Sequence, residues 1–219
     1  MCTNFVFVRS NGTTRFADHL GLDPESAIYG DHMPAARISI VLQTSSVKFE
    51  FVDAIWWLFL RQTDKGLQPH KDYFSVNTNH AKLPSRPEYK LSRCIIPATG
   101  FVESQSGRAP HLLERADGQV IVFGGLYKKW TDKQTGEVVH SASIITLPGV
   151  PALADIHRKS LPLWLPDHAI HDWLNPQITD PKPRFESLLE PALRANLIAT
   201  PIKKTTLKEP VGESFLISS

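Results

Sequence analysis

The chain has 219 residues, of which 42% are hydrophobic and 21% charged, and its formal net charge is +2. A chain of this length buries roughly two thirds of its unfolded surface, so we expect one soluble domain over residues 1–219 that folds without disulfides or metal ions. The small net charge excludes nucleic-acid binding by the overall field of the protein, and any such binding must come from a local cluster of Lys and Arg.

The apolar segments are too short for a membrane protein. The longest, residues 54–60 (AIWWLFL), is far shorter than the roughly 20 residues that cross a bilayer. The start of the chain also lacks a basic segment followed by an apolar run. Cys2 and Cys94 form neither a disulfide framework nor a C-x-x-C pair, so both are expected to be free thiols. We therefore expect a cytoplasmic monomer with no membrane partner.

Short apolar runs separated by Gly, Pro, Asn and Asp predict a series of strands. In chain order they are residues 5–8, 37–43, 48–59, 95–102, 120–126, 141–147 and 161–165. Asp117-Gly118 predicts a hairpin between the flanking runs HLLER and QVIVFGGLY, and Thr135-Gly136 predicts a second one, because Gly supplies the positive φ of a tight turn.

Helical spacing is best at residues 167–174 (DHAIHDWL) and 184–197, where Pro191 should kink or shorten the helix. There is no internal repeat. This distribution favours an α+β fold of mainly antiparallel strands, curved or closed into a barrel-like core, with a few peripheral helices.

Cys2 directly follows the initiator methionine, and because cysteine is small we expect methionine aminopeptidase to remove Met1. The product carries a free amine with a pKa of about 8 beside a thiol with a pKa of about 8.5. The amine attacks an aldehyde to give an imine, and the thiol then closes a five-membered thiazolidine that is much harder to hydrolyse. A cysteine also stands at position 2 in many proteins by chance, so this feature alone does not decide the function.

Three further residues are candidates for proton transfer or positioning. Glu103 follows a strand that Pro97 and Gly100 bend, and its carboxylate could shuttle protons or be a solvated strand end. His157 titrates near neutral pH, although a structural histidine is the commoner outcome. Asn77, in a segment with two amides, could orient an amine or a substrate oxygen, or form a turn.

Aromatic and cationic residues offer candidate contacts to a nucleic-acid strand. Trp56-Trp57 and Lys128-Lys129-Trp130 suit base stacking, although core packing explains at least one tryptophan of each group better than stacking does. Arg158-Lys159 and Lys203-Lys204 fit either phosphate contact or a solvated surface. No metal site is expected at His168-x-x-His171, because no Cys lies near it and two histidines alone do not complete a zinc site.

The identity and order of these residues resemble the SRAP family, named for SOS response-associated peptidases and associated with abasic-site processing. Three segments carry the likeness: Met1-Cys2-Thr3-Asn4-Phe5, then Asn77-Thr78-Asn79-His80-Ala81, then Arg93 to Glu103 (RCIIPATGFVE). Ile156-His157, followed by Pro162 and an apolar strand, completes the pattern.

The chain departs from the family pattern at several positions. Asn4 and Asn79 stand where the family usually has arginines that are expected to hold DNA phosphates. Ala81 replaces an acid, and Ser104 replaces the Trp after the glutamate. The loss of two arginines should weaken phosphate binding and its salt dependence.

The resemblance implies a covalent abasic-site sensor with a β-rich fold, acting on single-stranded DNA without a metal or organic cofactor. Cys2 would supply the amine and thiol, Asn77 would position the amine or the sugar, Glu103 would act as general acid and base, and His157 would assist proton transfer. DNA contacts are expected from Trp56, Asn79, Arg158 and Lys159. Two alternatives remain open: a cysteine peptidase that uses Cys2, His157 and Glu103, and a non-catalytic single-stranded nucleic-acid-binding module.

Overall fold

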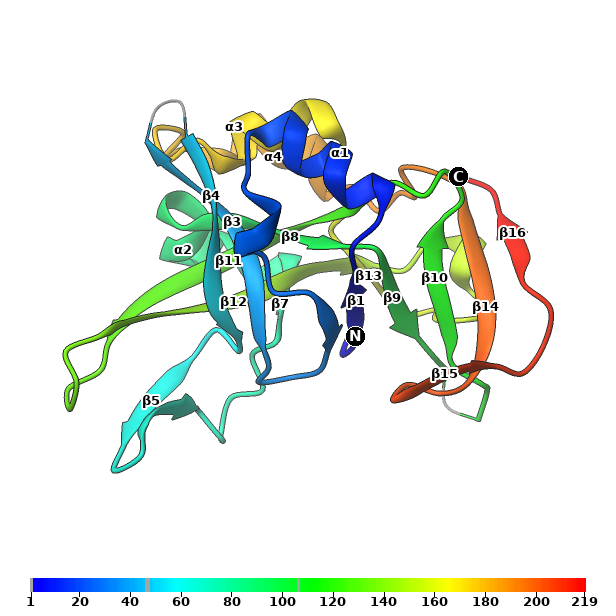
Figure 1. The fold of residues 1–219 in the computed structure, drawn as a ribbon. Helices are drawn as coiled ribbons and strands as arrows, with labels where there is room; N and C mark the ends of the chain where they lie inside the picture. Colours follow the sequence, from blue (N-terminus) through cyan, green and yellow to red (C-terminus); the bar gives the residue numbers. More distant parts are fainter. Residues whose placement is uncertain (1, 46–47, 106) are drawn as a thin grey trace.

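The centre of the fold is a closed β-barrel, described by a computed structural model that covers residues 2–45, 48–105 and 107–219 (Figure 1). Within these ranges five strands pair in a ring: β3 (Arg37–Ser45), β4 (Lys48–Trp56), β12 (Val138–Pro148), β11 (Ile121–Thr131) and β8 (Arg93–Ala98). The pairing of β4 with β12 is parallel, and the other four pairings of the ring are antiparallel. The predicted mainly antiparallel, barrel-like core is confirmed.

Apolar side chains on both faces of the barrel strands are buried. Ile38, Ile40 and Val41 on β3 and Ile95 on β8 are fully buried. The β-branched side chains suit a pleated strand that is covered on both faces. Gly125 lets β11 approach its neighbours, since an added Cβ would lie 2.8 Å from the Ser143 carbonyl oxygen.

A second sheet packs beside the barrel and contains both ends of the described chain. Its strand order is β15 (Leu207–Pro210), β14 (Leu197–Lys204), β10 (His111–Arg115), β9 (Gly100–Glu103), β1 (Phe5–Phe7) and β2 (Gly30–His32), with β16 (Phe215–Ile217) also paired to β14. The bend predicted at Pro97 and Gly100 divides residues 95–102 between the two sheets, because β8 ends in the barrel and β9 begins the second sheet. This crossing places Glu103 at the junction.

Several short strands lie next to the barrel strands in sequence or pair with them. The strands β5 (Leu60–Thr63) and β6 (Gly66–Pro69) form a separate hairpin, so the strand predicted for residues 48–59 ends earlier, at Trp56. β7 (Asn77–Asn79) and β13 (Ser160–Pro162) both pair with β12. Because β12 holds both short strands, it brings Asn77 and the segment after His157 toward one region of the fold.

The prediction of a hairpin at Asp117-Gly118 is wrong. The tight turn itself forms, with Gly118 at φ 68° and its amide bonded to the Arg115 carbonyl at 3.1 Å. However, β10 pairs with β9 and β14, whereas β11 pairs with β8 and β12, so the turn joins two different sheets. The hairpin predicted at Thr135-Gly136 is confirmed between β11 and β12.

The longest helix, α1 (Asn11–Leu20), was not predicted. Ser10 caps it, since its hydroxyl accepts from the Thr13 amide while the Thr13 hydroxyl accepts from the Ser10 amide, and Gly21 ends it at φ 62°. Together with α3 and α4 it covers one end of the barrel, at the top of Figure 1.

The helix predicted for residues 167–174 is present as the 3₁₀ turn Asp167–Ala169 followed by α3 (Ile170–Leu174). The helix predicted for residues 184–197 is much shorter. There α4 (Pro181–Phe185) continues into the 3₁₀ turn Glu186–Leu189, and helical structure stops before Pro191, which cannot supply the amide that a helix needs. A further helix, α2 (Pro87–Leu91), precedes β8. Of the described helices, none is both long and apolar enough to span a membrane.

The docking of α1 on the Asp117-Gly118 turn predicts a sensitive position. A Cβ added to Gly12 would lie 2.1 Å from the Gly118 carbonyl oxygen, so Gly12→Ala must displace backbone. We expect this variant to lower the free energy of unfolding by about 2 kcal/mol, as overpacking usually does, in urea denaturation. The exposed neighbour Asp18 provides the control: Asp18→Ala should change it by less than about 0.5 kcal/mol. Equal stability of the two variants would contradict this packing.

Candidate active site

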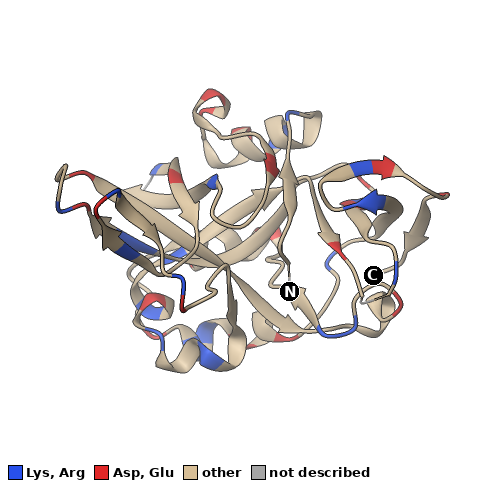
Figure 2. Ribbon diagram, turned by 90° about the horizontal axis from the view of Figure 1, so that it is seen from below, with Lys and Arg blue, Asp and Glu red and all other residues tan. Residues whose placement is uncertain are grey.

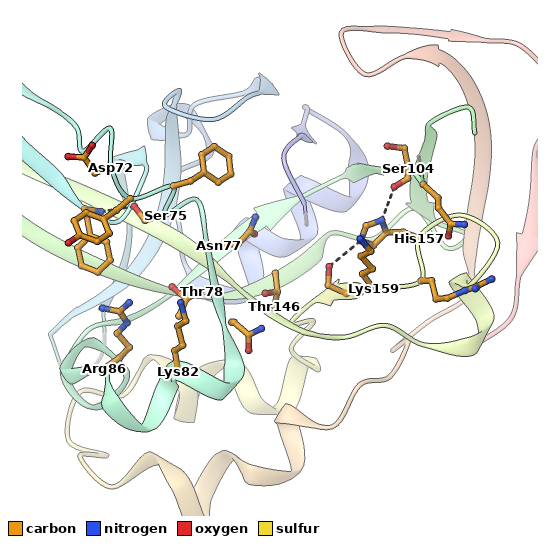
Figure 3. A pocket seen from close by; sticks show the side chains of 17 residues that line it. Asp72, Ser75, Asn77, Thr78, Lys82, Arg86, Ser104, Thr146, His157 and Lys159 are labelled. Atoms are coloured by element: carbon orange, nitrogen blue, oxygen red, sulfur yellow. Dashed lines mark hydrogen bonds between the residues drawn. The ribbon is translucent and has the colours of Figure 1, made fainter. Parts of the chain in front are cut away.

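A cavity of about 990 Å³ opens between the barrel and the second sheet. It is lined by residues 72–75, by β7 and the 3₁₀ helix that follows it (His80–Ser85), by residues 104–105 after β9, and by residues 157–160 before β13. Figure 3 shows Ser75 on one side of this cavity and His157 on the other, with Asn77 between them. Polar side chains from four separate parts of the chain thus meet at one place.

Cys2 lies at this junction and is completely buried. The side-chain amide of Asn77 donates a 2.7 Å hydrogen bond to the Cys2 carbonyl oxygen, and the Cys2 thiol lies 3.6 Å from the Asn4 carbonyl oxygen. Burial raises the pKa of the Cys2 thiol far above its ordinary value, and the charge of Glu103 raises it further. The thiol is therefore protonated at neutral pH. Asn77 holds the backbone of Cys2, a more specific contact than the sequence predicted.

A buried Glu103 and a partly buried His157 form a pair next to Cys2. Glu103 is 4% exposed, and its Oε2 atom lies 3.4 Å from Nδ1 of His157. Burial raises the pKa of Glu103 to about 7, so the carboxyl group is close to half protonated at neutral pH. A group with a pKa near the working pH can both give and take a proton, which is what general acid–base chemistry requires.

Two further hydrogen bonds orient His157. Its Nδ1 atom lies 2.8 Å from the Ser104 carbonyl oxygen, and Nε2 lies 3.2 Å from the Ser160 hydroxyl. Burial lowers the pKa of His157, so the imidazole is neutral at neutral pH. The structure thus brings together all four residues for which chemical roles were predicted: Cys2, Asn77, Glu103 and His157. Asn77 and His157 line the described cavity, while Cys2 and Glu103 lie buried behind them.

The residues predicted to contact DNA occupy different environments. Asn79, Arg158 and Lys159 line the cavity. Trp56 is 0% exposed, and its indole N–H donates to the Val76 carbonyl at 2.9 Å. The prediction that Trp56 stacks on a base is therefore wrong, because the side chain fills the core. Asn4 is also buried, and its side-chain amide donates to the Asp31 carboxylate at 2.5 Å. This hydrogen bond links the segment before β1 to β2.

Lys82 and Arg86, which the sequence analysis missed, also line the cavity. Lys82 lies in the 3₁₀ helix after β7, and Arg86 directly follows that helix. The Arg86 guanidinium lies 4.9 Å from the centre of the Phe59 ring. Basic and acidic residues are scattered over the ribbon (Figure 2), so Lys82 and Arg86 are recognisable only through their place beside the cavity. With Arg158 and Lys159 they give its rim a positive charge.

Arg93 and Cys94, which begin the Arg93 to Glu103 segment, are structural. Arg93 is buried and donates to the backbone carbonyls of Tyr89, Lys90, Trp173 and Asn175, which ties α2 and α3 to β8. Cys94 is fully buried in the barrel, and burial raises the pKa of its thiol far above the ordinary value. Among the described residues, no group of three or more His, Cys, Asp or Glu side chains is placed to hold a metal ion.

Comparison with known sequences gives the same family that the motifs resemble. A family model described as SOS response associated peptidase (SRAP) matches residues 1–208. The abasic site processing protein YobE of Bacillus subtilis (strain 168) is 32% identical over 127 residues, which cover 54% of this chain and 57% of YobE. YoqW, another abasic site processing protein of that strain, is 32% identical over 127 residues, which cover 54% of this chain and 55% of YoqW. The chain thus spans about half the length of the curated relatives it matches.

Two crystal structures share the fold. A protein from Bordetella bronchiseptica matches with a TM-score of 0.74 at 22% identity, over 93% of this chain and 100% of the other. A protein from Bacteroides thetaiotaomicron matches with a TM-score of 0.68 at 21% identity, over 93% of each chain. At these identities the likeness establishes the architecture.

Proposed function

Because the chain belongs to the SRAP family, we propose that it processes abasic sites in single-stranded DNA by forming a covalent thiazolidine through Cys2. The curated relatives YobE and YoqW are abasic site processing proteins, which supports the substrate. The observation that carries the proposal is the contact of Cys2 with Asn77, beside the buried Glu103–His157 pair and a cavity with a cationic rim.

The reaction balances without a cofactor. Removal of Met1 turns the backbone nitrogen of Cys2 from an amide into an amine. A proton moves from the C1 hydroxyl of the abasic sugar and another returns to its ring oxygen, so the ring opens to an aldehyde. The amine adds to this aldehyde and water leaves, which gives an imine. The thiol then adds across the C=N bond, its proton passes to nitrogen, and a thiazolidine forms with the net loss of one water.

The four site residues divide this work. Asn77 holds the Cys2 backbone in place. Glu103, with a pKa of about 7, exchanges the protons of ring opening and water loss. Nδ1 of His157 lies 3.4 Å from Oε2 of Glu103, so His157 assists this proton transfer. The protonated thiol is no obstacle, because the amine attacks first and the thiol acts only on the imine.

A cysteine peptidase needs a thiolate, and the site does not favour one. Burial raises the pKa of the Cys2 thiol, and both ring nitrogens of His157 already bond to oxygen atoms of Ser104 and Ser160. The non-catalytic binding module is disfavoured by the raised pKa of Glu103, since a buried carboxyl group destabilises the fold without contributing to strand binding.

The test is to mix the purified protein with a single-stranded oligonucleotide that carries one abasic site. We expect a heat-stable species on a denaturing gel, whose intact mass equals the protein without Met1 plus the DNA minus one water. Undamaged DNA and a tetrahydrofuran analogue, which has no aldehyde form, should give none. Protein that has lost Met1 and still forms no adduct would refute the proposal.

The cations at the cavity rim should account for part of the DNA affinity. Lys82→Ala and Lys159→Ala are each expected to weaken binding and to reduce the slope of log K against log salt by about 0.7, the value for one phosphate contact on a single strand. Anisotropy titrations with the tetrahydrofuran oligonucleotide measure binding without reaction. Lys133→Ala, at the exposed β11–β12 turn, is the control. An unchanged slope in both rim variants would place the strand elsewhere.

A further inference from the structure

Ser160 connects the buried acid–base pair to the cavity. Its hydroxyl lies 3.2 Å from Nε2 of His157, on the side of the ring opposite Glu103 and Ser104. Ser160 begins β13 and pairs with Pro148 of β12, so the sheet fixes its backbone. The backbone amide of His157 donates to the Leu153 carbonyl at 2.7 Å, which fixes the other partner.

The hydrogen bonds determine which nitrogen of His157 carries the proton. The Ser104 carbonyl can only accept, so Nδ1 must be the donor at 2.8 Å, in the bond that is drawn dashed in Figure 3. In a neutral imidazole the other nitrogen, Nε2, is then an acceptor. The Ser160 hydroxyl therefore donates its proton to Nε2 and keeps its oxygen lone pairs for another donor.

That second donor would come from the cavity. Ser160 and His157 both line it, whereas Glu103 is 4% exposed behind the imidazole. A proton that moves between a substrate hydroxyl and this pair must therefore cross the layer formed by His157 and Ser160. A serine hydroxyl can accept one proton while it gives up another, which suits it to this position.

We propose that Ser160 relays the proton of the abasic-site C1 hydroxyl to Nε2 of His157. The proposal rests on the function proposed above. As the sugar ring opens, the substrate O–H bond breaks and its proton passes to Oγ of Ser160, while the Ser160 proton passes to Nε2. The imidazolium that forms is stabilised by the Ser104 carbonyl and then passes its Nδ1 proton to the Glu103 carboxylate, 3.4 Å away. The sugar C1–O bond to the ring oxygen breaks, and that oxygen takes a proton from the solvent in the cavity.

The charged groups around the ring favour a neutral resting imidazole. Burial lowers the pKa of His157, the hydrogen bond to the Ser104 carbonyl opposes this effect, and the positive charge of Lys159 lowers the pKa further. Glu103 opposes this effect only in its ionised form. A hydroxyl that donates to Nε2 also stabilises the neutral ring, so its removal should raise the pKa of His157.

The kinetic test uses single-turnover crosslinking at saturating DNA. Ser160→Ala should slow adduct formation about tenfold, less than the loss of a direct acid or base, with unchanged affinity for the tetrahydrofuran oligonucleotide. Ser160→Cys, close to serine in size, should be slowed in the same way. Ser160→Thr retains the hydroxyl and should stay within about twofold of the wild type. Ser214→Ala is the control, because its hydroxyl bonds only Thr200 at the surface among the described contacts.

Two measurements separate a relay from a structural role. In mixtures of H₂O and D₂O, a plot of the wild-type rate against the fraction of deuterium should be curved, because two protons move in the same step. The same plot for Ser160→Ala should lose this curvature. Histidine NMR titration should show a higher pKa of His157 in Ser160→Ala. A wild-type rate for Ser160→Ala would overturn the relay alone, and an unchanged pKa of His157 would overturn the hydrogen bond on which it depends. Failure of the wild type to form any adduct would instead refute the proposed function.

Discussion

Replacement of Cys2 with alanine should abolish the heat-stable adduct with abasic single-stranded DNA completely. Removal of Met1 still leaves an N-terminal amine in Cys2→Ala, so an imine can form, but no thiol is present to close the ring. An imine hydrolyses on heating. The expected product is therefore visible only after trapping with borohydride, on the same denaturing gel that shows the wild-type adduct.

Cys2→Ser makes this test sharper. Its hydroxyl is a far weaker nucleophile than a thiol, so the imine should persist longer and allow more strand cleavage by β-elimination. We expect a borohydride-trapped adduct and more cleaved oligonucleotide than with the wild type. The change in the product, and not only in the amount, distinguishes loss of ring closure from loss of folding.

Cys94→Ala is the matched control for Cys2. Cys94 is fully buried in the barrel, on β8, and is the only other cysteine in the sequence. This variant should form the adduct at the wild-type rate. A heat-stable adduct with Cys2→Ala, or its loss in a folded Cys94→Ala protein, would assign the chemistry to a different group.

The strand positions could be predicted from the sequence, but not their partners. Alternating and continuous apolar runs mark strands wherever one face or both faces are buried. The closure of the barrel depends on the parallel pairing of β4 with β12, between residues about 85 positions apart, which no local pattern specifies. The Asp117-Gly118 turn illustrates the same limit, since its geometry is local while β10 and β11 find partners in different sheets.

Helix α1 was missed because its sequence, NGTTRFADHL, has few large apolar residues. The buried positions Gly12, Thr13, Phe16, Ala17 and Leu20 do follow a helical period, but three of them are small or polar. Ser10 with Thr13, followed by Gly21 after the last turn, was the signal that could have identified it.

The residues of the candidate site divide in a similar way. Cys2, Asn77, Glu103 and His157 were named because they stand in recognisable motifs. Lys82, Arg86 and Ser160 belong to common surface residue types, and only the fold brings them to the cavity. Trp56 was assigned to DNA because the continuous apolar run AIWWLFL does not show which tryptophan faces the core, whereas the structure buries Ala54 and Trp56 along β4.

Glu103→Gln should separate the activity of the protein from its stability. Loss of a general acid and base is expected to slow single-turnover crosslinking about 100-fold. The wild-type rate should change its dependence on pH near 7, where Glu103 titrates, and the variant should lack this inflection. Affinity for the tetrahydrofuran oligonucleotide should stay the same, because Glu103 lies behind the cavity wall.

The same substitution should make the folded protein more stable in mildly alkaline solution. Burial raises the pKa of Glu103 from 4.5 to about 7, so the protonated carboxyl group is favoured in the fold. Its contribution to stability is fully present below about pH 4.5 and is lost as the pH rises through 7. Glutamine resembles the protonated form at every pH, so Glu103→Gln should gain on the order of 1–3 kcal/mol at pH 8 and little at pH 4.

Urea denaturation at the two pH values measures this difference, with the exposed Glu137→Gln as control. A variant that is slower in crosslinking and more stable at pH 8 is the expected signature of a carboxylate kept in a buried place for its chemistry. If Glu103→Gln were less stable at both pH values, the carboxylate would be a structural partner of His157. The slower reaction would then follow from a disturbed site, and the assignment of proton transfer to Glu103 would be wrong.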